Sequence, residues 1–190
     1  MILRDITIIG MLPNIIDLDR SDKTVDLNSL ISQVNPNSLD LTIGNKYKRP
    51  VKHPAPVTYG FEGPNDRERY DFEYWVDEQD ERYITLEPDQ SVLACTREYI
   101  TMPENLCGQL FTKSSLGRMF INHMMAGVID AGFHGKLTLE LRNDGPHKVR
   151  IPVGSRVVQI YLMRLDGIPG HLYSERPSKY MGAETVECAK

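Results

Sequence analysis

The chain has 190 residues, of which 41% are hydrophobic, so it can bury the core of a single domain without disulfide bonds. Its 26 acidic and 22 basic residues give a formal net charge of −4, which excludes the basic surface that nucleic-acid-binding proteins carry. The three cysteines, an odd number with wide spacing, fit neither a disulfide framework nor a zinc site, and we expect them to be reduced.

The chain opens without a basic segment followed by an apolar one, and no run approaches the ~18 apolar residues of a membrane span. We therefore expect a cytoplasmic protein whose partners include neither membranes nor nucleic acids. A small anion can still bind in a local pocket, because the charge of a pocket and the net charge are separate quantities.

The first third of the chain contains a helix pattern and a strand pattern. Ile6, Ile9 and Leu12 have helical spacing, which predicts a short helix that ends at Pro13. Residues 38–43 alternate between polar and apolar side chains, which predicts a strand that ends at Gly44. Residues 59–82 are dense in charge with Gly and Pro at their start, which predicts a solvated hairpin on the surface.

The rest of the chain is rich in short β-type runs. These are YITL, SVLACT, EYIT, LCGQLFT, KLTLELRN, HKVRIPV and RVVQIYLMRL, separated by the turns EPDQ, MPEN, NDGP and VGS. Turns this frequent between strands this short predict an all-β sandwich, barrel or jelly roll, with SSLGRMF as a second short helix. We expect one domain, 1–190, whose polar tail at about 168–190 is mobile unless a ligand or neighbouring subunit orders it.

The turn KSSLGR is a candidate anion site. Ser115 stands where a helix N-cap would, which leaves backbone N–H groups of the next turn free to bind an anion. Lys113 and the two hydroxyls add a charge and donors suited to phosphate, although the glycines of a P-loop are missing. Taken alone, an ordinary capped turn is the commoner interpretation.

The run KLTLELRN carries a candidate acid. Its leucines share one face of the predicted strand, which leaves Thr138 and Glu140 on the other. Taken alone, a strand with one wet face is the commoner interpretation. The three glycines of AGVIDAGFHG just upstream imply tight backbone near Asp130, where a ligand can approach closely.

Four segments in this order and spacing resemble the trimeric dUTPase and dCTP deaminase superfamily. They are NPNSLDLTIG (35–44), KSSLGR (113–118), AGVIDAGFHGKLTLELRN (126–143) and VGSRVVQIYL (153–162). YSERPSKYMG (173–182) is similar to the nucleotide-covering C-terminal segment of that superfamily. The resemblance covers most of the chain outside 49–90. It implies a distorted jelly-roll or β-clip, dUTPase-like fold with one or two short helices, assembled as a homotrimer with sites between subunits.

Arg118 and Glu140 match the deaminase branch, whose members use the corresponding glutamate to activate water. The resemblance therefore implies a dCTP deaminase that hydrolyses C4 of cytosine without a metal and gives dUTP and ammonia. One carboxyl can serve first as the base for water and then as the acid for N3 and the amine. We expect no zinc, because zinc deaminases carry an HxE and PCxxC pair that this sequence lacks.

The resemblance also assigns roles to single residues. Ser114 and the backbone carbonyl of Ala126 would position the water, with Arg118 beside them. Asp130 would lie by the 3′-hydroxyl, as a second catalytic residue, and Phe133 would stack on the sugar; a turn-capping Asp and a core Phe are the alternatives. Mg²⁺ would be bound through the substrate triphosphate. The other expected substrate-binding residues are Lys113, Ser115, Val128, Gln159, Lys179 and Tyr180, with Tyr173 and Arg176 as weaker matches.

Several functions stay open at this point. Relatives that also cleave the triphosphate tend to carry Ala-Gly ahead of Ile-Asp, as residues 126–130 do here, so the product could be dUMP and diphosphate. A dUTP diphosphatase, a modified cytosine nucleotide as substrate and a nucleotide-binding β-sandwich without activity are further alternatives. The tail departs from its relatives, since Gly182-Ala183 replaces the common Gly-Gln and Glu184 follows.

Overall fold

The computed structural model contains residues 1–190, and the description below covers all of them except 53, 55, 57–73, 124–126, 176–179 and 189–190. The strands are β1 (Ile16–Asp17), β2 (Val34–Asn35), β3 (Ser38–Pro50), β4 (Trp75–Gln79), β5 (Tyr83–Leu86), β6 (Ser91–Thr101), β7 (Leu106–Thr112), β8 (Ile121–His123), β9 (Val128–Ile129), β10 (His134–Asn143), β11 (Val149–Pro152) and β12 (Arg156–Arg164). The helices are α1 (Asp5–Ile15), α2 (Leu27–Gln33), α4 (Ser114–Gly117) and the 3-10 helix η1 (Tyr173–Glu175).

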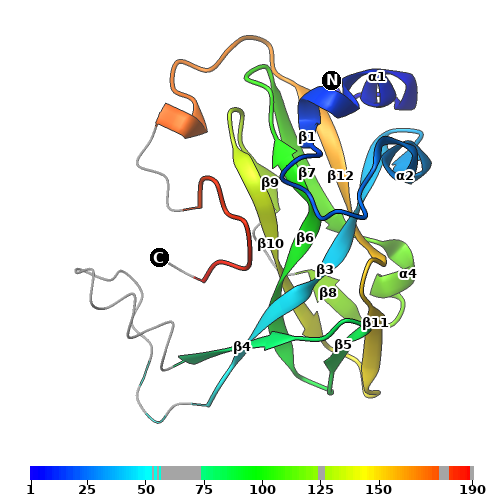
Figure 1. Ribbon diagram of the computed structural model, residues 1–190, viewed down its shortest axis with the longest axis vertical. Coiled ribbons are helices and arrows are strands. Elements are labelled where there is room, and N and C mark those ends of the chain that lie inside the picture. The colour runs from blue at the N-terminus through cyan, green and yellow to red at the C-terminus, as the bar shows by residue number, and fades with distance from the viewer. Residues whose placement is uncertain (53, 55, 57–73, 124–126, 176–179, 189–190) are drawn as a thin grey trace.

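One curled antiparallel sheet dominates the molecule. Its main path runs β8-β10-β6-β3-β12-β7-β9, with β1, β2 and β4 paired at its edges, and β5 and β11 form a separate pair. Figure 1 shows α1 and α2 at one end of the long strands and the β5–β11 pair at the other. The prediction of a mainly β fold is confirmed.

The core lies inside the curl of the sheet, and the central strand β3 is buried on both faces. Its apolar side Leu39, Leu41 and Ile43 joins the hydrophobic core, and its polar side is buried too. Polar side chains can be buried here because they have partners: the carboxylate of Glu98 accepts from Thr42 N at 2.9 Å and from Thr42 Oγ1 at 2.7 Å. Burial raises the pKa of Glu98.

The helices differ from the sequence prediction. The helix expected to end at Pro13 continues to Ile15, because a proline in the last turn removes only one helical hydrogen bond. The structure has three α-helices among its described residues, rather than one or two. The missed one, α2, had a readable signal: Asp26 and Ser29 form a capping box, with hydrogen bonds of 2.7 and 3.0 Å between each side chain and the other residue's backbone N–H.

Two strands are longer than predicted. β3 continues past Gly44 to Pro50. Gly44 lets β3 and β6 approach closely, because a Cβ atom there would stand 3.2 Å from the carbonyl oxygen of Cys95 on β6. This glycine therefore marks close contact between strands and not the end of one. SVLACT and EYIT belong to the single strand β6, in which a bulge opposite Lys136 and Thr138 produces the apparent break.

Residues 75–79 of the segment predicted as a solvated hairpin form β4, which pairs with the far half of β3. Residues 59–73 of that segment lie outside the described part of the chain. Over its far half β3 therefore stands between β4 on one edge and β6 on the other.

Candidate active site

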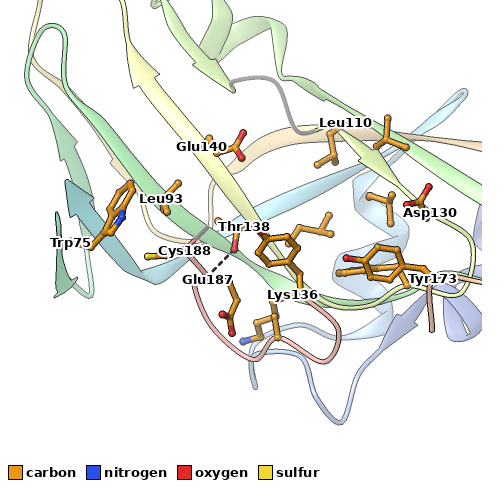
Figure 2. Close-up of a pocket in the computed structure, with 16 residues that line it drawn as sticks. Trp75, Leu93, Leu110, Asp130, Lys136, Thr138, Glu140, Tyr173, Glu187 and Cys188 are labelled. Carbon is orange, nitrogen blue, oxygen red and sulfur yellow. Dashed lines mark hydrogen bonds between the residues drawn. The ribbon is translucent and has the colours of Figure 1, made fainter. Parts of the chain in front are cut away.

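A cavity of about 330 Å³ lies against β10 and β9, and residues of β4 and of the end of the chain contribute to its lining. Its lining residues are Trp75, Leu93, Leu110, Val128, Ile129, Asp130, Phe133, Lys136, Leu137, Thr138, Glu140, Tyr173, Tyr180, Ala183, Glu187 and Cys188. Figure 2 shows Asp130 and Tyr173 at one end, Trp75 and Leu93 at the other, and Glu140 between them. The volume is in the range of small-molecule sites.

β10 places Glu140 by strand alternation. Leu139 and Leu141 are fully buried in the core, while Thr138 and Glu140 are half-buried and line the cavity. On the neighbouring strand β6, Leu93 stands directly opposite Glu140 and lines the cavity with it. The predicted alternation of this run is confirmed, and its polar face belongs to a cavity rather than to open solvent.

The edge of β10 that faces away from β6 has two different partners. β8 pairs with residues 141–143, and the end of the chain bonds to residues 134–138. We call residues 180–188, which make the second contact, the C-terminal strap. Glu140 therefore lies at the gap between the two partners, where the sheet edge opens to the cavity.

The loop from β9 to β10 forms the other end of the cavity. The rings of Phe133 and Tyr173 meet edge to face with centroids 5.6 Å apart, and Tyr173 N donates to Ala131 O at 3.0 Å. Burial raises the pKa of Tyr173, and the charges of Asp130 and Tyr180 add to the shift. Asp130 and the two tyrosines thus lie close enough to interact electrostatically.

The turn KSSLGR forms α4, but its cap differs from the prediction. Lys113, not Ser115, is the N-cap residue, and no side chain caps the helix. Nζ of Lys113 donates to Oδ2 of Asp40 at 2.7 Å. Gln159 on β12 stands directly opposite Asp40 on β3. Lys113 and Gln159 therefore both lie next to the buried carboxylate of Asp40.

The structure divides the predicted site residues into two groups. Those that line the cavity are Val128, Asp130, Phe133, Glu140, Tyr173 and Tyr180. Of the described residues, Lys113, Ser114, Ser115, Arg118 and Gln159 are absent from the lining. Figure 1 shows α4 on the opposite side of the strands from the strap. Ala126, Arg176 and Lys179 lie outside the described residues.

The cavity also contains residues that sequence reasoning missed, above all Trp75, Glu187 and Cys188. Trp75 stood in a charge-dense segment, and only its pairing with Pro50 across β4 and β3 brings it to Leu93. Glu187 and Cys188 stood in the polar tail, with no periodic pattern to signal burial. No local signal could have found these three residues.

Two absences hold for the part of the chain that the structure describes. No three His, Cys, Asp or Glu side chains lie close enough together to share a metal ion. No helix is long and apolar enough to cross a membrane.

The dCTP deaminase-like family model matches residues 13–165, which span β3, α4, β9, β10 and β12. The chain belongs to this family. Among curated members of the dCTP deaminase-like family, the chain is similar to "dCTP deaminase, dUMP-forming" of Methanothermobacter thermautotrophicus, with 37% identity over 79% of this chain and 76% of the relative. The relative of the same name from Methanopyrus kandleri is 35% identical, over 88% of this chain and 86% of the relative.

A solved member of the dCTP deaminase-like family has the same fold. The crystal structure of 2′-deoxycytidine 5′-triphosphate deaminase from Agrobacterium tumefaciens superposes with a TM-score of 0.61 at 25% identity. The match covers 85% of this chain and 47% of the solved chain, so this chain spans about half the length of that protein.

Proposed function

We propose that this protein is a dCTP deaminase that hydrolyses C4 of the cytosine base with Glu140 as the proton carrier. One observation carries the proposal: Glu140 lines a cavity together with Asp130 and Phe133, in a chain of the dCTP deaminase-like family. A nucleotide-binding module without activity would have no use for a half-buried carboxylate at that place.

The reaction needs one group that takes and returns protons. The oxygen of a water molecule bonds to C4 while one water proton passes to Glu140, which delivers that proton to N3. Glu140 then moves the remaining hydroxyl proton to the amine, the C4–N bond breaks, and ammonia leaves behind a C4 carbonyl. Water and dCTP thus become dUTP and ammonia. Thr138 and Leu93 line the cavity together with Glu140.

The sugar and the water are held by groups that we assign from the family resemblance. Asp130 would accept a hydrogen bond from the 3′-hydroxyl, and the buried ring of Phe133, packed against Tyr173, would leave no room for a 2′-hydroxyl. Ser114 and the carbonyl of Ala126 would position the water, with Arg118 nearby.

The complete site would form between copies of the chain in a homotrimer. Support comes from the separation of the predicted residues. Ser114 at the start of α4 and Arg118, its C-cap residue, are exposed and lie away from the cavity that Glu140 lines. A neighbouring copy that brings its α4 to this cavity would unite the two groups.

Mg²⁺ would reach the site on the triphosphate of the substrate. The described residues hold no cluster of three ligating side chains, so phosphate oxygens and water would supply most of its ligands. The ion would neutralise phosphate charge there, and Lys113 and Lys179 would add positive charge around the same phosphates.

A coupled second reaction has support from the names of the curated relatives, which are dUMP-forming. Asp130 lines the cavity directly after Val128 and Ile129 of β9, which line it too. There it could take a proton from a second water, whose oxygen attacks the α-phosphorus while the bond to the β-phosphate oxygen breaks. The products would be dUMP and diphosphate.

Incubation of the pure protein with dCTP and Mg²⁺ tests the proposal, with ammonia assayed and the nucleotides separated by chromatography. We expect one ammonia for each dCTP consumed. Absence of ammonia while dUTP is still cleaved would instead show a dUTP diphosphatase, and binding without turnover would show a nucleotide-binding module.

A further inference from the structure

The C-terminal strap is a wall of the cavity rather than a free tail. Gly182 N donates to His134 O at 2.8 Å, Lys136 N donates to Ala183 O at 2.8 Å, and Glu187 N donates to Thr138 Oγ1 at 3.1 Å. Each of these bonds joins the strap to β10. The last of them is made by Thr138, two residues before Glu140.

These contacts alone make a weak attachment. The strap side chains that are buried are small ones, Ala183, Val186 and Cys188. Small side chains remove little apolar surface from water, and short segments near a chain end detach easily unless a further contact ties them down. A further contact is therefore needed to keep the strap docked on β10, where it forms part of the cavity wall.

The ion pair between Arg20 and Glu184 provides this further contact. Nε of Arg20, in the loop after β1, lies 2.9 Å from Oε1 of Glu184, and Nη2 of the same guanidinium donates to that oxygen as well. The guanidinium also stacks on the ring of Tyr99, with Cζ 4.0 Å from the ring centroid. The hydroxyl of Tyr99 lies 3.1 Å from Nδ1 of His134 on β10, so the contacts run unbroken from the strap to the strand.

We propose that Arg20 is a positioning residue, which holds Glu184, and with it the C-terminal strap, against β10 so that the cavity around Glu140 is closed. Arg20 touches no cavity atom itself, since it is absent from the lining among the described residues. The inference deepens the proposed function, on which its kinetic part rests; its structural part concerns the strap alone.

The size of the effect follows from the exposure of the pair. The side chains of Arg20 and Glu184 are 41% and 56% exposed, and exposed ion pairs contribute little by themselves. Stacking on the buried Tyr99 limits the motion of the guanidinium and adds to the contact. We expect loss of the pair to lower the ratio of docked to undocked strap about three- to tenfold.

Charge reversal tests the inference. The variants are Arg20→Glu, Glu184→Arg and the double swap, each read by amide hydrogen exchange of the peptide that covers 180–188. Both single variants should exchange about three- to tenfold faster, and the double swap should recover part of the protection because the charges pair again. KM for dCTP should rise by no more than the same factor, because the apparent affinity follows the docked fraction of the strap. At saturation kcat should stay within about twofold, because bound nucleotide favours the docked strap.

Lys148 and Glu87 supply a matched control. They form an ion pair of 2.6 Å at 54% and 51% exposure, next to the end of the separate β5–β11 pair, and neither residue lines the cavity. Reversal of either charge should leave exchange of the strap and KM unchanged. Wild-type exchange in Arg20→Glu, or a double swap that exchanges as fast as the single variants, would overturn the inference. If the protein does not deaminate dCTP at all, the exchange results still decide whether Arg20 holds the strap.

Discussion

Lys113 and Asp40 form an ion pair in which Nζ of the lysine lies 2.7 Å from Oδ2 of a fully buried carboxylate. Asn35 Nδ2 donates to the other carboxylate oxygen at 2.8 Å, so Asp40 has partners on both oxygens. Lys113 was predicted as a phosphate-binding residue. Its position gives it a structural task as well, because it neutralises a charge that water cannot reach.

Lys113→Met should therefore lower the free energy of unfolding by about 2–4 kcal/mol, since removal of one partner leaves the other charge buried with less compensation. Arg156, whose Nη1 lies 3.8 Å from Asp40, limits the loss. Urea unfolding measures the change, and Lys148→Met, which breaks an exposed pair, should stay within about 0.5 kcal/mol of wild type. Equal stability of the two variants would contradict the structural role.

Glu140→Gln should reduce the rate of deamination on the order of 10²-fold or more, because the amide keeps the shape of the carboxylate but cannot carry the proton. Binding of dCTP, measured by calorimetry, should change little. Glu104→Gln is the control, since Glu104 is exposed and stands outside the cavity lining of the described residues. Near-normal turnover in Glu140→Gln would leave this glutamate as an ordinary polar residue of β10.

Arg118→Ala and Glu140→Gln should each be inactive alone but should complement each other when co-expressed. If Arg118 and Glu140 of one site come from different copies, about a quarter of the sites in randomly mixed trimers receive both wild-type residues. Specific activity near that share of wild type supports a shared site. No recovery in mixed trimers, or a monomer in sedimentation at micromolar concentration, would show that one copy holds the whole site.

Asp130→Asn should divert the product from dUMP to dUTP, because the amide cannot take a proton from the water that attacks the α-phosphorus. Phosphorus NMR of completed reactions distinguishes the two outcomes. Stoichiometric dUTP without diphosphate from the unaltered protein would rule out the coupled reaction.

Gly135→Ala should destabilise the fold by about 1–3 kcal/mol, since Gly135 has a φ of +151° and an added Cβ would stand 3.1 Å from both Ala183 N and the Phe133 ring. The loss should fall partly on the strap, as faster amide exchange of 180–188. Gly10→Ala is the control, because nothing lies within 4 Å of its Cβ position in α1, and it should stabilise by about 0.5–1 kcal/mol. A neutral Gly135→Ala would mean that the strap backbone does not need this glycine.

The sequence by itself determined the features that depend on local pattern. Alternation in KLTLELRN fixed which face of β10 carries Glu140, because side chains on a strand point to opposite faces in turn. Frequent turns between short apolar runs determined the mainly β class, and the order of the matching segments identified the family. The capping box of Asp26 and Ser29 was equally local and was available to be read.

Only the tertiary structure decided what lies around Glu140. Trp75 and Cys188 reach the same cavity from distant parts of the sequence, through pairing of β4 with β3 and through docking of the strap on β10. The pairing of Lys113 with Asp40 likewise joins residues far apart in the chain. Such contacts follow from sheet register and from burial of a whole surface, and neither quantity is encoded in a short stretch of residues.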